Sequence, residues 1–304
     1  MLTIRQMRYF EALAATGHFG RAASLVNISQ PALSAQIAEM ERILDIKLVE
    51  RGRGGAFLTA EGQDLLPDIR QILENIDRLQ SRVQAGQGPL RGRLRLGIIP
   101  TIAPYLVPEL IPQVRSHYPD LNIELKESLT STCIDDLRHG RLDCAVVALP
   151  AQGEGLESTF LFEDRFLIAS AADENTILIS PMTEDSVDVE RLLLLEEGHC
   201  MRDQALAICG TAAGRRVANY GATSMATLLQ MVSHGMGITL IPEIAVRDEA
   251  SRNRMRIVRF AEPQPSRRIG LIWRSSASAK RRDFEALASV VRRSATGLLQ
   301  AAAA

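Results

Sequence analysis

Residues 27–44 read NISQPALSAQIAEMERIL, and this stretch decides the fold of the amino-terminal part of the chain. Ser29 is of a residue type that caps helix amino termini, and Pro31 suits the first turn of a helix. The apolar residues after them recur at three- and four-residue spacing, which predicts an amphipathic helix from about residue 31 to 44. These apolar residues are Leu33, Ile37, Met40 and Leu44.

Two further helices are predicted before this stretch, at residues 4–15 and 21–26, with Gly17 ending the first. Two helices joined by a tight turn, with small polar side chains at the start of the second, are typical of the helix-turn-helix motif. Serine and glutamine side chains at that place reach base edges in DNA. A small helical bundle that does not bind DNA is the alternative that the pattern leaves open. The residues predicted to contact DNA from the second helix are Ser29, Gln30, Pro31, Ser34 and Gln36.

A short hairpin is predicted next. Residues 48–51 and 56–58 flank a glycine-rich turn, which indicates a wing beside the helix-turn-helix. Arg51 and Arg53 lie at its tip, where arginine side chains suit contact with DNA phosphates.

A long helix follows the wing. It is predicted to begin after Thr59, an N-cap residue type, and to run to about Gln84 with a sustained apolar stripe. This helix is longer than a small domain needs, so we expect it to pair with its copy in a dimer. Packing against its own wing domain is the alternative, and both can hold at once. Residues 86–89 contain two glycines and a proline and predict a hinge.

The remainder of the chain alternates strand-like and helix-like segments. Such alternation predicts parallel sheets with helices on both faces. Folds of this kind bind their ligands at the carboxyl ends of the strands. The strand-like segments are residues 94–99, 123–126, 144–149, 166–170, 177–180, 192–195, 238–241, 257–260 and 269–273.

Composition limits the class of protein. The chain has 304 residues, enough for two or three domains, and its 46% hydrophobic and 23% charged residues suit a globular protein with a sizeable core. It shows no signal-peptide pattern and no run of about 18 apolar residues, so we expect a cytoplasmic protein without membrane contact. A formal net charge of −1 argues against non-specific coating of nucleic acid, but it leaves room for a small DNA-binding domain.

The cysteines carry a second signal. Four cysteines in a chain of this size, without an export signal, predict reduced thiols. Cys200 and Cys209 are nine positions apart. In a helix, nine steps separate the Cα atoms by about 13 Å and point the side chains to nearly opposite faces, whereas a disulfide needs Cα atoms within about 7 Å. If the segment is a helix, this pair can bridge only after the segment refolds.

About the first 90 residues resemble the winged helix-turn-helix and linker helix of LysR-type transcriptional regulators, and the resemblance extends over the whole chain. Ala60 departs from the proline that is usual in the family, but alanine also fits the first turn of a helix. The matching features are residues 7–10, 19–23, 29–34, Ile37, Glu41, 48–51 and 58–62.

This resemblance implies an α/β fold in which a winged helix-turn-helix and a long linker helix precede a two-lobed effector domain built like a periplasmic binding protein. The implied boundaries are 1–58 for the DNA-binding domain, 59–88 for the linker and dimerisation helix, and 89–304 for the regulatory domain. Within the regulatory domain, lobe I takes residues 89–163 and 268–304, and lobe II takes residues 164–267.

Residues 198–205, followed by Cys209, resemble the redox segment of the peroxide-sensing OxyR branch of that family. The resemblance implies that hydrogen peroxide oxidises Cys200, the peroxidatic thiol, to a sulfenic acid, and that Cys209 is the resolving thiol of the disulfide. Positive charge from His199, Arg202 and Arg267, together with a helix amino terminus, would favour the Cys200 thiolate, and positive charge would also favour the breaking of the O–O bond. Arg268, next to Arg267, is the one-residue alternative.

Three further residues receive roles from the same resemblance. Thr101 and Thr130 would line the peroxide pocket and bind the peroxide oxygens, and Thr130 would cap a helix. Asp203 would receive or relay a proton. Neither a cofactor nor a metal is implied.

The resemblance also implies partners. They are double-stranded promoter DNA, copies of the same chain in a homotetramer that is a dimer of dimers, RNA polymerase, and a glutaredoxin- or thioredoxin-type reductant. Hydrogen peroxide would be the signal, genes of peroxide defence the targets, and the chain itself a regulator and not an enzyme.

Two alternatives remain open. In the first alternative, a small organic ligand between the two effector lobes gates a LysR-type regulator. Cys200 and Cys209 are then ordinary buried thiols. The second is a thiol-dependent peroxidase with an accessory domain, which the winged-helix signature disfavours. Cys133 and Cys144 are interpreted as structural.

Overall fold

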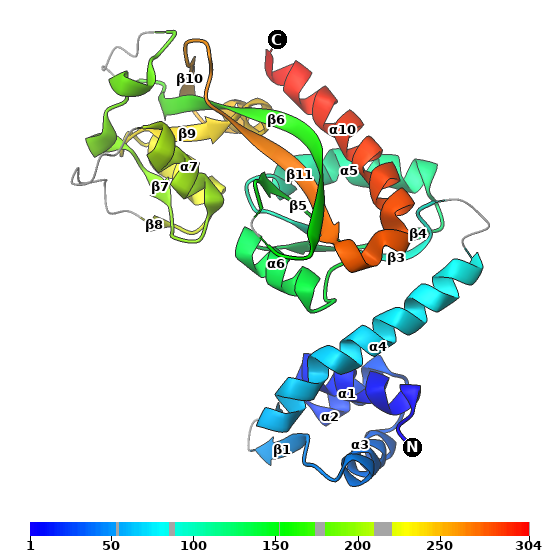
Figure 1. The fold of residues 1–304 in the computed structure, drawn as a ribbon. Coiled ribbons are helices and arrows are strands. Elements are labelled where there is room, and N and C mark those ends of the chain that lie inside the picture. Colours follow the sequence, from blue (N-terminus) through cyan, green and yellow to red (C-terminus); the bar gives the residue numbers. More distant parts are fainter. Residues whose placement is uncertain (53–54, 85–88, 152, 174–179, 210–220, 304) are drawn as a thin grey trace. The chain divides into compact units, whose positions relative to one another are not determined.

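The structure, a computed structural model, describes residues 1–304 except 53–54, 85–88, 152, 174–179, 210–220 and 304 (Figure 1). The chain forms two compact units, Met1–Gln87 and Gly88–Ala304. Among the described residues, no helix is both long enough and apolar enough to cross a membrane.

The amino-terminal unit begins with three helices, α1 (Ile4–Thr16), α2 (Phe19–Leu25) and α3 (Gln30–Leu44). Ser29 is the N-cap of α3, as predicted, and its Oγ accepts a hydrogen bond from the backbone N–H of Ala32 at 3.4 Å. α2 begins two residues before the predicted start, because Nδ1 of His18 accepts a hydrogen bond from the backbone N–H of Gly20 at 3.1 Å and caps the helix.

The predicted wing is confirmed as a hairpin of β1 (Val49–Gly52) and β2 (Gly55–Leu58), which pair antiparallel. Arg51 lies on β1, whereas Arg53 lies outside the described residues. The carboxylate of Glu41 on α3 accepts hydrogen bonds from the backbone N–H groups of Leu48 and Val49, at 2.9 and 3.2 Å. The wing is therefore tied directly to the predicted recognition helix.

The long helix α4 (Ala60–Gln84) follows the wing. Oγ1 of Thr59 accepts a hydrogen bond from its first turn at 3.0 Å, as expected of an N-cap. Ile69 and Leu73 are buried in the same core as Phe10 of α1, while Ile72 is 41% exposed. One face of α4 thus packs on its own wing domain, and pairing of α4 with a second copy stays a prediction.

A seven-stranded sheet forms the centre of the second unit, in the order β10-β6-β11-β5-β3-β4 with β9 paired to β6. Its strands are β3 (Gly92–Ile98), β4 (Leu121–Glu127), β5 (Cys144–Leu149), β6 (Leu156–Ala171), β9 (Thr239–Pro242), β10 (Met255–Arg259) and β11 (Ser266–Arg274). A separate parallel pair is formed by β7 (Leu194–Leu195) and β8 (Gly221–Ala222).

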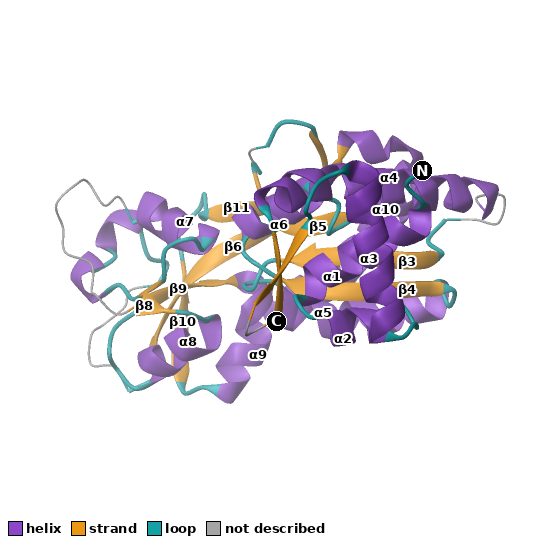
Figure 2. Ribbon diagram, turned by 90° about the horizontal axis from the view of Figure 1, so that it is seen from below, coloured by secondary structure: helices purple, strands orange, loops and turns teal. Residues whose placement is uncertain are grey.

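The prediction of parallel sheets is confirmed for only part of this unit. β3 is parallel to β4 and β5, but β6 pairs antiparallel with β9, β10 and β11, and β11 is antiparallel to β5. The reason is the path of the chain, which leaves the first lobe along the long strand β6 and returns along β11 in the opposite direction. Figure 2 shows these two strands side by side between the lobes.

Helices surround the sheet of the second unit. α10 (Arg281–Ala303) packs on α5 (Ala103–His117), and α6 (Thr130–Arg138) packs on β5 and β11 (Figure 1). The second lobe carries α7 (Cys200–Ile208), α8 (Met225–Ser233) and α9 (Glu243–Arg252). Short 3-10 helices cover Glu184–Ser186, Val189–Arg191 and Ser275–Lys280. The strand predicted at 177–180 lies almost entirely outside the described residues.

Candidate functional site

The sheet register brings three of the predicted site residues to one edge. β3 and β4 run parallel with Ile98 opposite Glu127, so Thr101 and Thr130 both follow the carboxyl ends of neighbouring strands. β11 is antiparallel to β5 with Arg268 opposite Leu149, so the beginning of β11, with Arg267, lies at that same edge. This is the edge at which parallel α/β sheets bind ligands.

Arg267 is fully buried and holds Thr101 there. Its Nη1 donates to Oγ1 of Thr101 at 2.8 Å, and Nη2 donates to the Thr101 carbonyl at 3.4 Å. The same guanidinium donates from Nε and Nη2 to Oδ2 of Asp164, at 3.0 and 2.8 Å, and neither charged side chain is exposed. Arg267, and not the neighbouring Arg268, is therefore the arginine that contacts Thr101. Arg268 lies over the ring of Phe160, 5.3 Å from its centroid.

Thr130 is the first residue of α6, and Leu129 occupies the N-cap position without a side-chain cap hydrogen bond. The expectation that Thr130 caps the helix is wrong by one residue. Its hydroxyl is buried and has no partner among the described residues. A buried hydroxyl without a partner is costly, so this atom is suited to receive a polar ligand.

The segment before Cys200 lies against the start of α6. A Cβ atom added to Gly198 would lie 3.3 Å from Cδ1 of Leu129, and Gly198 has a φ of +93°, which favours glycine. Gly198 is two residues before Cys200, and Leu129 is the residue before Thr130. The amino termini of α6 and α7 therefore approach each other across the two lobes.

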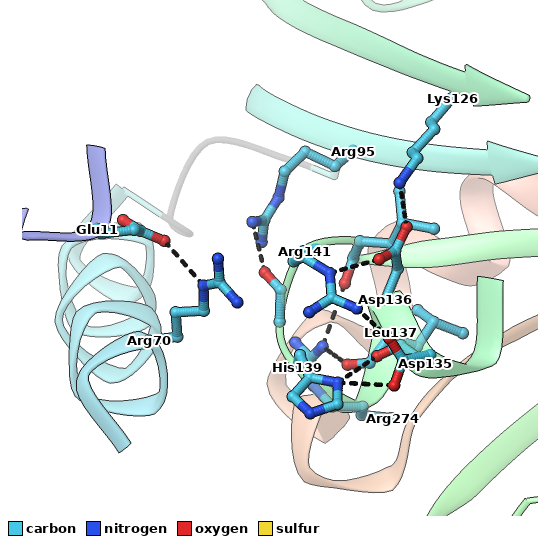
Figure 3. Close-up of polar contacts among 12 residues, drawn as sticks. Glu11, Arg70, Arg95, Lys126, Asp135, Asp136, Leu137, His139, Arg141 and Arg274 are labelled. Carbon is cyan, nitrogen blue, oxygen red and sulfur yellow. Dashed lines mark hydrogen bonds and ion pairs between the residues drawn. The ribbon is translucent and has the colours of Figure 1, made fainter. Parts of the chain in front are cut away.

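The carboxyl end of α6 is held by a separate polar network (Figure 3). Nη1 of Arg274 donates to the carbonyls of Leu137 and Leu142, the latter at 3.1 Å. Asp136 forms ion pairs with Lys126, at 2.5 Å, and with Arg141. The contact with Leu137 satisfies one of the last carbonyls of the helix, and the network as a whole fixes α6 at the end opposite to Thr130.

Cys200 is the first residue of α7 and is partly buried against the hydrophobic core, with His199 as the N-cap. Burial lowers the pKa of His199, against the opposing effect of Glu196 and of a hydrogen bond with the Thr223 backbone. Burial thus favours the neutral imidazole, which opposes the predicted positive charge on His199. Arg202 donates to the Leu195 carbonyl at 2.9 Å and is the cation nearest in sequence.

Asp203 and Gln204 continue the same helix. Asp203 is exposed, and its role in receiving or relaying a proton stays a prediction. The sequence reasoning missed Gln204, whose Oε1 is buried without a partner among the described residues. Gln204 is four residues after Cys200 and therefore shares its helix face. The four-residue spacing from Cys200 is the sequence signal that would have identified Gln204.

Cys209 is at the other end of α7, where it is the C-cap residue and is buried. Burial, with a smaller effect from Glu184, raises the pKa of its thiol to about 11. Because α7 is a helix between the two cysteines, their Cα atoms are separated by about 13 Å. Because this segment is a helix, a disulfide between Cys200 and Cys209 can form only after the segment refolds. Cys133 and Cys144 are buried free thiols, as their structural interpretation expects.

The predicted DNA-contacting residues lie on the start of α3. Ser29, Gln30, Pro31 and Gln36 are exposed, and Ser34 is half-buried. An exposed amino-terminal end of a recognition helix, next to a wing, is the arrangement that places side chains in a DNA groove.

Comparison with known proteins agrees with this architecture. Residues 4–63 match the bacterial regulatory helix-turn-helix protein of the lysR family, and residues 87–295 match the LysR substrate binding domain. Over 276 residues the chain is 38% identical to a probable hydrogen peroxide-inducible genes activator of Mycobacterium avium, covering 90% of this chain and 89% of that protein.

Solved structures of OxyR proteins are also similar. A full-length OxyR variant from Pseudomonas aeruginosa has a TM-score of 0.81 and 32% identity, and covers 96% of this chain and 95% of that chain. A Corynebacterium glutamicum OxyR mutant described as H2O2-bound has a TM-score of 0.69 and 33% identity, with 99% and 95% covered. The chain therefore belongs to the LysR family of transcriptional regulators, in the group of OxyR-like members.

Proposed function

We propose that the chain is a transcriptional regulator that senses hydrogen peroxide through Cys200 and Cys209 and controls genes of peroxide defence. The observation that carries this proposal is the position of the two thiols on one helix. Cys200 is partly accessible at the start of α7, two residues after Gly198, which lies against Leu129, and Cys209 is buried at the end of the helix. The relatives named hydrogen peroxide-inducible genes activators and the H2O2-bound OxyR structure support the choice of signal.

The first chemical step is reduction of peroxide by Cys200. The thiolate sulfur attacks one peroxide oxygen, the O–O bond breaks, and a sulfenic acid forms on Cys200. The leaving hydroxide takes up a proton and departs as water. The hydroxyls of Thr101 and Thr130 bind the two oxygens, and the amino terminus of α7 favours negative charge on the sulfur.

The second step is formation of the disulfide. The sulfur of Cys209, once deprotonated, attacks the sulfenic sulfur and releases hydroxide, so that two thiols and one peroxide yield one disulfide and two waters. Cys209 must first leave its buried position, and α7 must unwind. This refolding changes the packing of the second lobe and so alters the regulatory unit that controls DNA binding. A glutaredoxin- or thioredoxin-type protein resets the switch.

The assembly is part of the same proposal. The exposed start of α3 and the wing bind double-stranded promoter DNA in the cytoplasm, and α4 pairs with a second copy on the way to a tetramer. The bound regulator then acts on RNA polymerase at the promoter. DNA binding is expected to weaken strongly with salt, because arginines contact phosphates.

Mass spectrometry of the peptide that contains Cys200 and Cys209, after one equivalent of hydrogen peroxide, tests the redox mechanism. We expect a loss of two hydrogens that links the two cysteines and is reversed by dithiothreitol. Cys200→Ser removes both products, whereas Cys209→Ser leaves a sulfenic acid that dimedone traps. Cys133 and Cys144 in the same sample are the matched control thiols, since both are buried and the pKa of each is raised by burial.

A second candidate is a regulator gated by a small organic ligand between the lobes. The match of residues 87–295 to a substrate binding domain favours it. Unmodified thiols after stoichiometric peroxide, together with a metabolite that raises the melting temperature and changes the DNA footprint without oxidation, would establish this candidate and remove the first. A peroxide-dependent footprint that persists in Cys200→Ser would also contradict peroxide sensing through this thiol.

A further inference from the structure

Asp164 is a buried carboxylate to which the mechanism above gives no role. It lies on β6 directly opposite Arg267 of β11 and is 0% exposed. Its Oδ2 accepts two hydrogen bonds from the Arg267 guanidinium, and its Oδ1 accepts one from the backbone N–H of Ile244, in the first turn of α9, at 3.0 Å. The carboxylate is thus fixed from two sides.

This pairing changes what Arg267 can do. A guanidinium that shares two hydrogen bonds with a buried carboxylate forms a neutral pair, so it supplies little net positive charge to a nearby thiol. The ring of Phe166 lies 5.6 Å from the guanidinium carbon and adds an apolar wall on another side. The function that remains for Arg267 is to orient a neighbouring side chain.

The side chain that Arg267 orients is the hydroxyl of Thr101. Nη1 of Arg267 donates to Oγ1 of Thr101 at 2.8 Å, which occupies a lone pair of that oxygen. A hydroxyl has a single hydrogen, and with Arg267 as donor this hydrogen must point away from the guanidinium. It is then free to be donated to another oxygen at the carboxyl edge of the sheet, where Thr130 also lies.

The geometry points to Asp164 as a positioning residue for peroxide reduction, which acts by holding Arg267 so that the Thr101 hydroxyl donates its hydrogen to the bound peroxide. This inference rests on the proposed peroxide chemistry of Cys200. Asp164 itself touches neither the thiol nor the peroxide. Its effect passes through Arg267 and Thr101.

Asp164→Asn tests the inference with two rates measured on the Cys200 peptide of the full chain. One is the rate of oxidation by hydrogen peroxide, and the other is the rate of alkylation by iodoacetamide at the same pH. We expect oxidation to slow by about 10- to 100-fold, because a misplaced donor costs rate of this order. Alkylation is expected to stay equal or to become faster, since it needs no donor from Thr101 and the Arg267 charge is no longer compensated.

A general loss of structure would slow or accelerate both reactions together, so the ratio of the two rates separates positioning from folding. Asp143→Asn is the matched control. Asp143 is also a buried carboxylate that accepts from an arginine, Arg95, through Nε at 3.1 Å and backbone N–H at 2.8 Å, but it precedes β5 at the opposite edge of the sheet. Its variant should leave the ratio unchanged.

A double-mutant cycle adds a second arm. Because Asp164 acts through Thr101, we expect Asp164→Asn to slow oxidation much less in a Thr101→Ala background than in the natural chain. If Asp164→Asn does not fold, Asp164→Glu takes its place, because it keeps a negative charge beside Arg267 but moves the carboxylate by one methylene and so displaces the guanidinium. We expect the same slowed oxidation from it.

Equal oxidation rates for the natural chain and for these Asp164 variants would overturn the inference, as would additive effects of the Asp164 and Thr101 substitutions. Such results leave the peroxide mechanism intact. If the natural chain is not oxidised by one equivalent of peroxide, the proposed function itself fails, and this is visible before any variant is compared.

Discussion

Cys200 and Cys209 occupy the two ends of a single helix, α7, with Cys200 as its first residue and Cys209 as its C-cap. A helix of this length holds the two Cα atoms about 13 Å apart and points the thiols to nearly opposite faces, so it keeps the reduced state from closing the disulfide. The same helix that gives Cys200 an amino-terminal position therefore blocks the second chemical step until it unwinds.

The first prediction concerns backbone protection in α7. We expect the amide protons of residues 203–209 to exchange with solvent much faster after oxidation, because a disulfide between Cys200 and Cys209 is incompatible with the hydrogen bonds of the helix. Hydrogen exchange followed by mass spectrometry measures this. Cys209→Ser treated with peroxide is the control, and it should keep its protection. Unchanged protection in a chain that carries the disulfide would contradict the refolding model.

The second prediction concerns stability at alkaline pH. The folded state raises the pKa of Cys209 to about 11, against about 8.5 for an unfolded thiol. The stability that the protonated thiol contributes is therefore complete below about pH 8.5 and is lost as pH rises through 11. We expect Cys209→Ser to lose less unfolding free energy than the natural chain between pH 8.5 and 11.

Fluorescence of Trp273 is a suitable measurement for this comparison. It is the one tryptophan of the chain, and its ring stacks on Phe284 with centroids 5.2 Å apart. Other groups also titrate in this range, but they are common to both proteins and cancel in the difference. Parallel losses of stability in the two proteins would show that Cys209 is not buried in the folded state.

The third prediction concerns His199. Because burial lowers its pKa, the imidazole is mainly neutral above pH 7. We therefore expect His199→Gln to leave the rate of Cys200 alkylation between pH 7 and 8 within about twofold of the natural rate, since removing a neutral group does not alter the charge near the thiol. The check is an iodoacetamide time course at several pH values. A tenfold fall in that rate would restore the cationic role.

Several features of the fold could be predicted from the sequence. Capping residues such as Ser29 and Thr59 act on their own helices, so their roles follow from local spacing. The direction of β6 and β11 did not follow, because periodicity indicates a strand but not its partner. Asp164 was missed for the same reason, as its burial depends on Arg267, 103 residues away. The charge of His199 required knowledge of its burial, which no neighbouring residue reveals.

The last prediction concerns a buried contact between the two lobes. The hydroxyl of Tyr105 on α5 donates to Oε1 of Glu249 on α9 at 3.0 Å, and Nδ2 of Asn253 donates to Oε2 of the same carboxylate at 3.0 Å. Tyr105→Phe removes one donor and leaves a buried carboxylate oxygen without it, which costs about 1–3 kcal/mol of unfolding free energy. Urea unfolding followed by Trp273 fluorescence measures the loss.

Tyr118→Phe provides the control for this experiment, because Tyr118 lies at the other end of α5 and is only half-buried. It should cost well under 1 kcal/mol, as most substitutions of partly exposed side chains do. Equal losses for the two variants would mean that the Tyr105 hydroxyl contributes nothing through Glu249. A larger loss for Tyr105→Phe, with peroxide oxidation of Cys200 unchanged, would assign this contact to the joining of the lobes and not to the redox chemistry.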